Sequence, residues 1–166
     1  MYYDNLRQDK GRMDGLTVFF TVLSGVITFV VGQLVVKLIL DPVHDLKKTI
    51  GQISHALIEQ ANVISNPDVS TKEEKDETSL LLRKLSASLH AHLYLVPAYV
   101  TICRIFRLPS KEKLLSASTN LIGLSNGIYS ANRTKADEWN AKRIETICDS
   151  LGIYLAEGSR WPRDLK

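Results

Sequence analysis

The sequence has few cysteines, few aromatic residues and no marked excess of charge of either sign. Cys103 and Cys148 are its two cysteines, too few for a disulfide framework. Each lies in an apolar helical pattern, where a thiol packs as a small hydrophobic side chain, although a bridge between the two helices is an open alternative. The pattern favours a reducing compartment.

Nucleic acid is not an expected partner. The chain has 21 basic and 18 acidic residues, a net charge of +3, with no long basic block. Its aromatic residues are not interleaved with arginines, as a stacking platform for single-stranded nucleic acid requires.

Catalytic and ligand-binding motifs are also missing. No serine or cysteine stands in a nucleophile motif, and there is no glycine-rich phosphate loop. His90 and His92 are two residues apart, which places them on different faces of a helix rather than on one metal-binding face. The acidic run at residues 73–77 is typical of a solvated helix start rather than a calcium loop. We therefore predict no enzyme activity, no metal, no cofactor and no small-molecule substrate.

One long apolar segment dominates the N-terminal part. No charged residue occurs between Gly15 and Val36, and fourteen of the side chains from Leu16 to Val36 are Leu, Val, Ile or Phe. A bilayer core of about 30 Å requires about 20 helical residues. The sequence predicts a tail over residues 1–15 and a transmembrane helix over residues 16–40. A cleaved signal peptide is disfavoured because no small-residue cleavage site follows.

The direction of insertion is not fixed by charge. Three basic residues precede the predicted span and three follow it: Arg7, Lys10 and Arg12, then Lys37, Lys47 and Lys48. The unpaired thiols and the absence of secretory features favour a cytoplasmic C-terminal domain.

Small residues recur every four positions within this segment, as they do where membrane helices pack closely. Chance is the alternative, since Thr, Ser and Gly are common in such helices. The candidate helix–helix interface consists of Thr21, Ser24, Gly25, Thr28, Gly32 and Gln33.

The remainder predicts a helical domain over residues 41–157 and a tail over residues 158–166. Asp41-Pro42 is typical of an N-cap with proline at the first helical position. Apolar residues then recur at three- and four-residue steps from Val43 to Ile64, either packing within the domain or forming an intermolecular coiled coil. Gly51 and Gly123 are expected at helix crossings.

Capping signals predict three further helices. Ser70 with Glu73 or Thr71 with Glu74 forms a capping box, Ser110 is an N-cap, and Thr134 with Asp137 gives a weaker capping signal. Their expected core faces are Leu81, Leu85, Leu89, Leu93 and Val96; Leu114, Ala117, Leu121, Leu124 and Ile128; and Trp139, Ile144, Ile147, Cys148 and Leu151. No stretch alternates as a strand does, so the fold class is all-α, with a small antiparallel helical bundle after the transmembrane helix.

A second apolar stretch runs from Leu93 to Phe106. It is short, contains Pro97 and carries Arg104 near its end. A core helix or one lying at a membrane interface is therefore favoured over a second span.

Several short patterns carry a resemblance. They are Ile39-Leu40-Asp41-Pro42, Ile50-Gly51-Gln52-Ile53 with Ala56-Leu57 and Ala61-Asn62, and Ile122-Gly123-Leu124-Ser125-Asn126. From about residue 16 to 155 the chain resembles short bacterial single-pass membrane proteins with an N-terminal anchor and a helical domain without an assigned activity. The resemblance implies the bacterial inner membrane and no catalytic residue.

These features predict a non-enzymatic membrane-anchored protein whose helical domain mediates self-association or binds a protein partner. The alternative is a membrane-disrupting or pore-forming effector, as in antiphage defence or a toxin system. It is motivated by the small-residue face with Gln33 and by the apolar stretch from Leu93 to Phe106.

Overall fold

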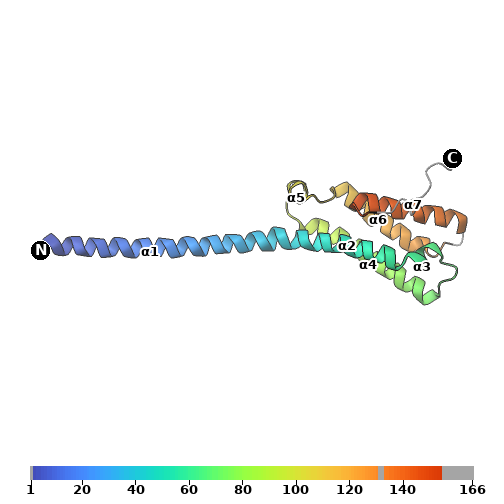
Figure 1. The fold of residues 1–166 in the computed structure, drawn as a ribbon, viewed down its shortest axis with the longest axis horizontal. Coiled ribbons are helices and arrows are strands. Elements are labelled where there is room, and N and C mark those ends of the chain that lie inside the picture. Colours follow the sequence, from blue (N-terminus) through green and yellow to red (C-terminus); the bar gives the residue numbers. More distant parts are fainter. Residues whose placement is uncertain (1, 131–132, 155–166) are drawn as a thin grey trace. The chain divides into compact units, whose positions relative to one another are not determined.

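A computed structural model describes the backbone at residues 2–130 and 133–154, and the side chains at residues 15–130 and 138–154. Every regular element in these ranges is a helix, which confirms the all-α class. The elements are α1 (Tyr2–Val35), η1 (Val36–Leu40), α2 (Asp41–Glu59), α3 (Ala61–Ser65), α4 (Lys72–Leu95), α5 (Tyr99–Phe106), α6 (Lys111–Gly127) and α7 (Arg133–Leu151) (Figure 1). The chain divides into two compact units between Leu40 and Asp41.

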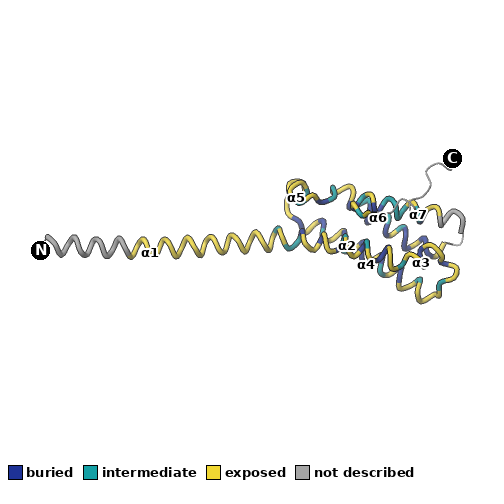
Figure 2. The backbone as a smooth tube through the Cα atoms, viewed as in Figure 1, coloured by how far each residue is buried: buried dark blue, intermediate teal, exposed yellow. Residues whose placement is uncertain are grey.

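The first unit consists of α1 and the π-helical turn η1. It is long and apolar enough to cross a membrane, and the large apolar residues of α1 from Leu16 to Val35 are exposed (yellow in Figure 2). The helix begins at Tyr2, so much of the expected tail is helical in its backbone. Residues 2–14 contain no proline, and their polar side chains are compatible with a helix.

The expected N-cap at Asp41 is wrong, because η1 leads directly into α2 without a capped break. A proline inside a helix lacks an N–H and its ring clashes with the carbonyl group four residues earlier. The π turn immediately before Pro42 gives a physical reason why the helix continues, since an insertion of this kind loosens the backbone ladder at that position.

Four helices carry most of the packing in the second unit. α4 packs against α2 and α6, and α6 also packs against α7. Polar pairs show that α2 and α4 run in opposite directions: Thr49 Oγ1 lies 2.9 Å from His92 Nδ1, and Thr78 Oγ1 donates to Gln60 Oε1 at 2.8 Å. The fully buried apolar residues are Leu46, Ile53, Ile64, Leu82, Leu89, Leu114, Leu121, Leu124, Ile128 and Ile147.

The core faces agree with the sequence in α6 and deviate in the two neighbouring helices. All five residues expected in α6 are buried. In α4, Leu82 is fully buried and Leu81 only partly. In α7 the prediction that Trp139 belongs to the core is wrong. Its side chain is 59% exposed, whereas Asn140 is 2% exposed. Asn140 lies on the same face of α7 as Ile147 and Leu151, which follow it at steps of seven and four residues. Trp139 is one residue earlier and therefore points to a different side.

Capping residues mark where several helices begin or end. Thr71 Oγ1 accepts from the Glu74 N–H, and Glu74 Oε2 accepts from the Thr71 N–H, so one of the two expected capping boxes is confirmed. Ser110 Oγ caps α6 by accepting from the Lys113 N–H. α4 ends at Leu95, two residues before Pro97, and Gly152 has a φ of 70° after α7, as a C-cap requires.

Candidate functional site

The strongest candidate for a functional surface is one face of α1. At about 100° of rotation per residue, six small residues fall within an arc of about 100°. They are Thr17, Thr21, Ser24, Gly25, Thr28 and Gly32, named here the small-residue face. Between Thr17 and Gly32 no larger side chain lies in this arc, and every other position carries Val, Leu, Ile or Phe.

The hydroxyl groups on this face donate to their own helix. Thr21 Oγ1 donates to Thr17 O at 2.8 Å, and Ser24 Oγ donates to Thr21 O at 2.9 Å. Thr28 Oγ1 donates to Ser24 O at 2.8 Å. Because these protons are satisfied within the helix, the face needs no water to cover it and presents a shallow surface to its surroundings.

At Gly25 and Gly32 the small-residue face exposes the helix backbone, because glycine has no side chain. A Cβ atom built on either glycine meets no atom within 4 Å. The backbone at both positions is therefore open to contact from outside the unit. Close approach of two helix backbones requires such positions.

Gln33 lies outside the small-residue face, although residue spacing predicts it in the same interface. By helical rotation it lies about 80° beyond the nearest edge of the arc. Thr17 lies inside the arc, although the predicted interface does not include it. The angular positions of both residues follow from a rotation of about 100° per residue, whereas spacing by four residues does not give them.

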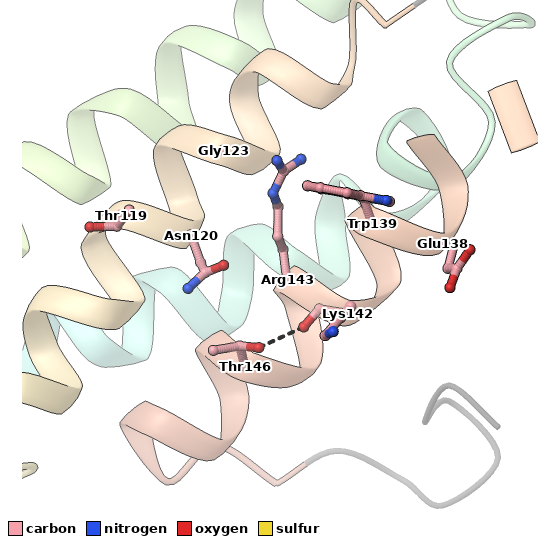
Figure 3. A pocket seen from close by; sticks show the side chains of 8 residues that line it. All are labelled: Thr119, Asn120, Gly123, Glu138, Trp139, Lys142, Arg143 and Thr146. Atoms are coloured by element: carbon pink, nitrogen blue, oxygen red, sulfur yellow. Dashed lines mark hydrogen bonds between the residues drawn. The ribbon is translucent and has the colours of Figure 1, made fainter. Parts of the chain in front are cut away.

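A second candidate is a pocket of about 500 Å³ between α6 and α7 (Figure 3). Its lining residues are Thr119, Asn120, Gly123, Glu138, Trp139, Lys142, Arg143 and Thr146. The guanidinium group of Arg143 lies 5.7 Å from the centre of the Trp139 ring, and its side chain extends toward Gly123. The lining has no cysteine, histidine or serine, and the hydroxyl group of Thr146 donates to the Lys142 carbonyl oxygen at 2.8 Å rather than to the side chain of a base.

The glycines of α6 explain how α7 packs so closely. A Cβ atom on Gly123 would lie 2.7 Å from Arg143 Nε, and one on Gly127 would collide with Asn140 Oδ1. Gly123 therefore has the crossing role expected from the sequence. The same expectation for Gly51 is wrong, because a Cβ atom there meets nothing within 4 Å.

The histidines and cysteines are separated from one another. His92 contacts Thr49, His90 lies beside the Tyr94 ring, and His55 contacts Glu59 at 3.5 Å on the exposed side of α2. Cys148 is buried in α7 and Cys103 lies half-buried in α5, and no disulfide joins them. In the described ranges, no three His, Cys, Asp or Glu side chains are grouped as metal ligands.

Comparisons with protein-family models, with curated proteins and with solved structures gave no match to this chain. The resemblance to bacterial single-pass membrane proteins therefore stays a prediction.

Proposed function

We propose that this protein is a non-enzymatic membrane-anchored module that self-associates through the small-residue face of α1. In this proposal residues 16–40 span the bacterial inner membrane once. The helices of the second unit form a small antiparallel bundle in the cytoplasm, where the assembled anchor brings several copies together or presents them to a protein partner.

The angular separation of residue sizes around α1 carries the proposal. Lipid tails are as apolar as leucine, so large apolar side chains gain little by pairing in a bilayer, and helices associate where small residues permit close packing. In α1 all six small residues between Thr17 and Gly32 share one face. The exposure of both glycines leaves that face available to a second copy.

The same face argues against a water-filled pore. A pore wall needs polar groups that hydrogen-bond to water, and the hydroxyl groups of Thr21, Ser24 and Thr28 donate their protons to backbone carbonyl groups, so only their oxygens are left to accept from water. Gln33, the remaining polar side chain of the segment, lies off the face. The geometry favours close helix packing over the pore-forming alternative.

Energy transfer between donor- and acceptor-labelled full-length protein in liposomes tests the proposal. Gly25→Leu with Gly32→Leu fills the small-residue face, and we expect it to weaken association at least about tenfold, because the backbones can no longer approach. Val26→Phe with Val30→Phe is the matched control, since it adds bulk on the opposite side of the helix and should leave transfer unchanged.

Two outcomes would contradict the proposal. Transfer no higher than random proximity for the original chain in liposomes would show that self-association is absent. Equal loss of transfer in the two double variants would show that the small-residue face is not the interface. Dye release from the same liposomes would instead support the pore-forming alternative.

A further inference from the structure

The corner between α4 and α5 has an outer surface that the described residues of the second unit leave exposed. α5 is bent by 106° from α4, and left-handed residues bound it on both sides, Ala98 with a φ of 44° and Arg107 with a φ of 53°. Such backbone angles are unfavourable outside glycine. Ala98 lies between the two helices, so α5 turns sharply away from α4 instead of extending it, and Arg107 ends α5.

The two faces of α5 differ in burial. Ile102 is buried, and Tyr99, Cys103 and Phe106 are partly covered on the same side. Tyr99 Oη donates to Pro109 O at 2.6 Å, which ties this inner face to the start of α6. On the outer face Val100 and Ile105 are 68% and 66% exposed. Tyr94 and Leu95 at the end of α4 extend this exposed apolar surface.

The segment that forms this corner carries basic charges only, whereas Asp41 and Asp45 at the start of α2 and Glu112 at the start of α6 are acidic. No acidic residue occurs between Glu77 and Glu112. Arg104 and Arg107 are exposed within or just after α5, and the Lys111 ammonium group lies 5.5 Å from the centre of the Tyr94 ring. The corner thus combines exposed apolar side chains with arginines, a lysine and a tyrosine.

The corner lies at the end of the second unit where α2 begins. Because α2 and α4 run in opposite directions, the contact between Thr49 and His92 places the last turn of α4 beside the first turns of α2 (Figure 1). Asp41, the first residue of α2, directly follows the apolar helix. If that helix spans a bilayer, chain connectivity keeps this end of the unit near the membrane surface.

We propose that the outer face of α5 docks on the membrane surface and binds anionic lipid headgroups. Val100 and Ile105 enter the boundary between headgroups and acyl chains, while Arg104 and Arg107 bind lipid phosphates. The inference rests on the proposed membrane anchor, and it adds a second, reversible contact between the protein and the bilayer.

Three observations favour lipid over a protein partner for this surface. The exposed apolar side chains and the arginines alternate along one short helix, as in helices that lie at a membrane interface. Arginine forms paired hydrogen bonds with phosphate. The covalent anchor supplies the bilayer at high local concentration, so even a small surface can be occupied.

Fluorescence of an environment-sensitive dye on the full chain in liposomes tests the docking. In a Cys103→Ser, Cys148→Ala background, the dye is attached at Ile105→Cys, at Leu80→Cys or at Phe29→Cys. Leu80 is an exposed control near the opposite end of α4, and Phe29 reports the anchor. The liposomes are phosphatidylcholine alone or with phosphatidylglycerol, and both contain a nitroxide lipid that quenches nearby dye.

We expect strong quenching at position 105 in the anionic liposomes, weak quenching in the neutral ones, and none at position 80. Each arginine near an anionic surface contributes about fivefold to binding, so Arg104→Gln with Arg107→Gln should lower the docking equilibrium about thirtyfold. Lys72→Gln with Lys84→Gln removes the same charge from the exposed side of α4 and should change nothing. Circular dichroism of each variant verifies that the helices are retained.

The outcomes separate this inference from the anchor on which it rests. Quenching at position 29 without quenching at position 105 overturns the docking and leaves the anchor standing. No quenching at position 29 overturns both. Equal quenching at position 105 in neutral and anionic liposomes overturns the assignment of anionic headgroups.

Discussion

Helices α1 and α6 both carry large apolar and small residues, but their surroundings are opposite. α6 turns one side inward, where Leu114, Leu121 and Leu124 are almost completely buried, and it exposes lysines at its start. The large apolar residues of α1 are exposed all round. A helix that is apolar on every side belongs in an apolar medium, and one with an apolar stripe belongs on a protein core. Apolar content separates the two helices: fourteen of the 21 residues from Leu16 to Val36 are Leu, Val, Ile or Phe, against five of the 17 residues of α6.

The sharpest test of this comparison truncates one apolar side chain in each helix. Leu121→Ala should lower the free energy of unfolding of the second unit by about 2–5 kcal/mol, because Leu121 is fully buried and its removal leaves a cavity. Val26→Ala in α1 should leave that free energy unchanged. Urea denaturation in detergent, followed by circular dichroism, measures both.

Similar losses in the two variants would show that α1 contributes to the folding of the second unit. That result would contradict the contrast between the helices.

A smaller effect is expected from two glycine substitutions. Gly127→Ala should destabilise the second unit by about 1–3 kcal/mol, because the added methyl group collides with Asn140. Gly51→Ala, at an exposed position of α2 with open space, should stabilise it by up to about 1 kcal/mol through higher helix propensity. Thermal denaturation of the two variants compares them directly, and a gain in stability in Gly127→Ala would contradict the close α6–α7 crossing.

The smallest effect concerns Tyr99 in α5. Burial, with a smaller contribution from Cys103, raises the pKa of Tyr99 from 10.0 to about 12. The stability that this difference provides is complete below pH 10 and is lost as the pH rises toward 12, because the unfolded chain ionises first. Tyr99→Phe should weaken the unit slightly at pH 8 by removing the hydrogen bond to Pro109, and should then lose less stability than the original chain at alkaline pH.

Urea midpoints of both proteins measured from pH 8 to pH 12 test this prediction. Parallel decline of the two curves would show that Tyr99 is not protected from ionisation.

Much of the fold could be predicted because local signals were strong. The capping box at Thr71, the N-cap at Ser110 and the α6 core face depend on residues within one or two turns of each other. The apolar helix could also be recognised from composition alone. These features require no knowledge of which helix packs against which.

The failures came where a neighbouring helix or an unusual backbone decided the outcome. Asn140 replaces Trp139 in the core because Gly127 leaves room for its side chain on α6, a contact that spacing within α7 does not reveal. Pro42 follows a π turn that has no clear sequence signature. The predicted interface contains five of the six residues of the small-residue face. It lacks Thr17 and adds Gln33, because spacing by four residues does not give the angular position of every residue around the helix.

The order of the helices along the chain has a consequence for synthesis. α4 packs against α6, and α6 packs against α7, so each meets the long helix that follows it in the chain. α7 also contacts α2 and α3, the first helices of the unit. As the ribosome adds residues, local pairs can form early, because loops between neighbouring helices close quickly. The contacts of α2 and α3 with α7 must wait for the last helix, so a nascent chain that lacks it carries incompletely covered apolar surface, the usual condition for chaperone binding.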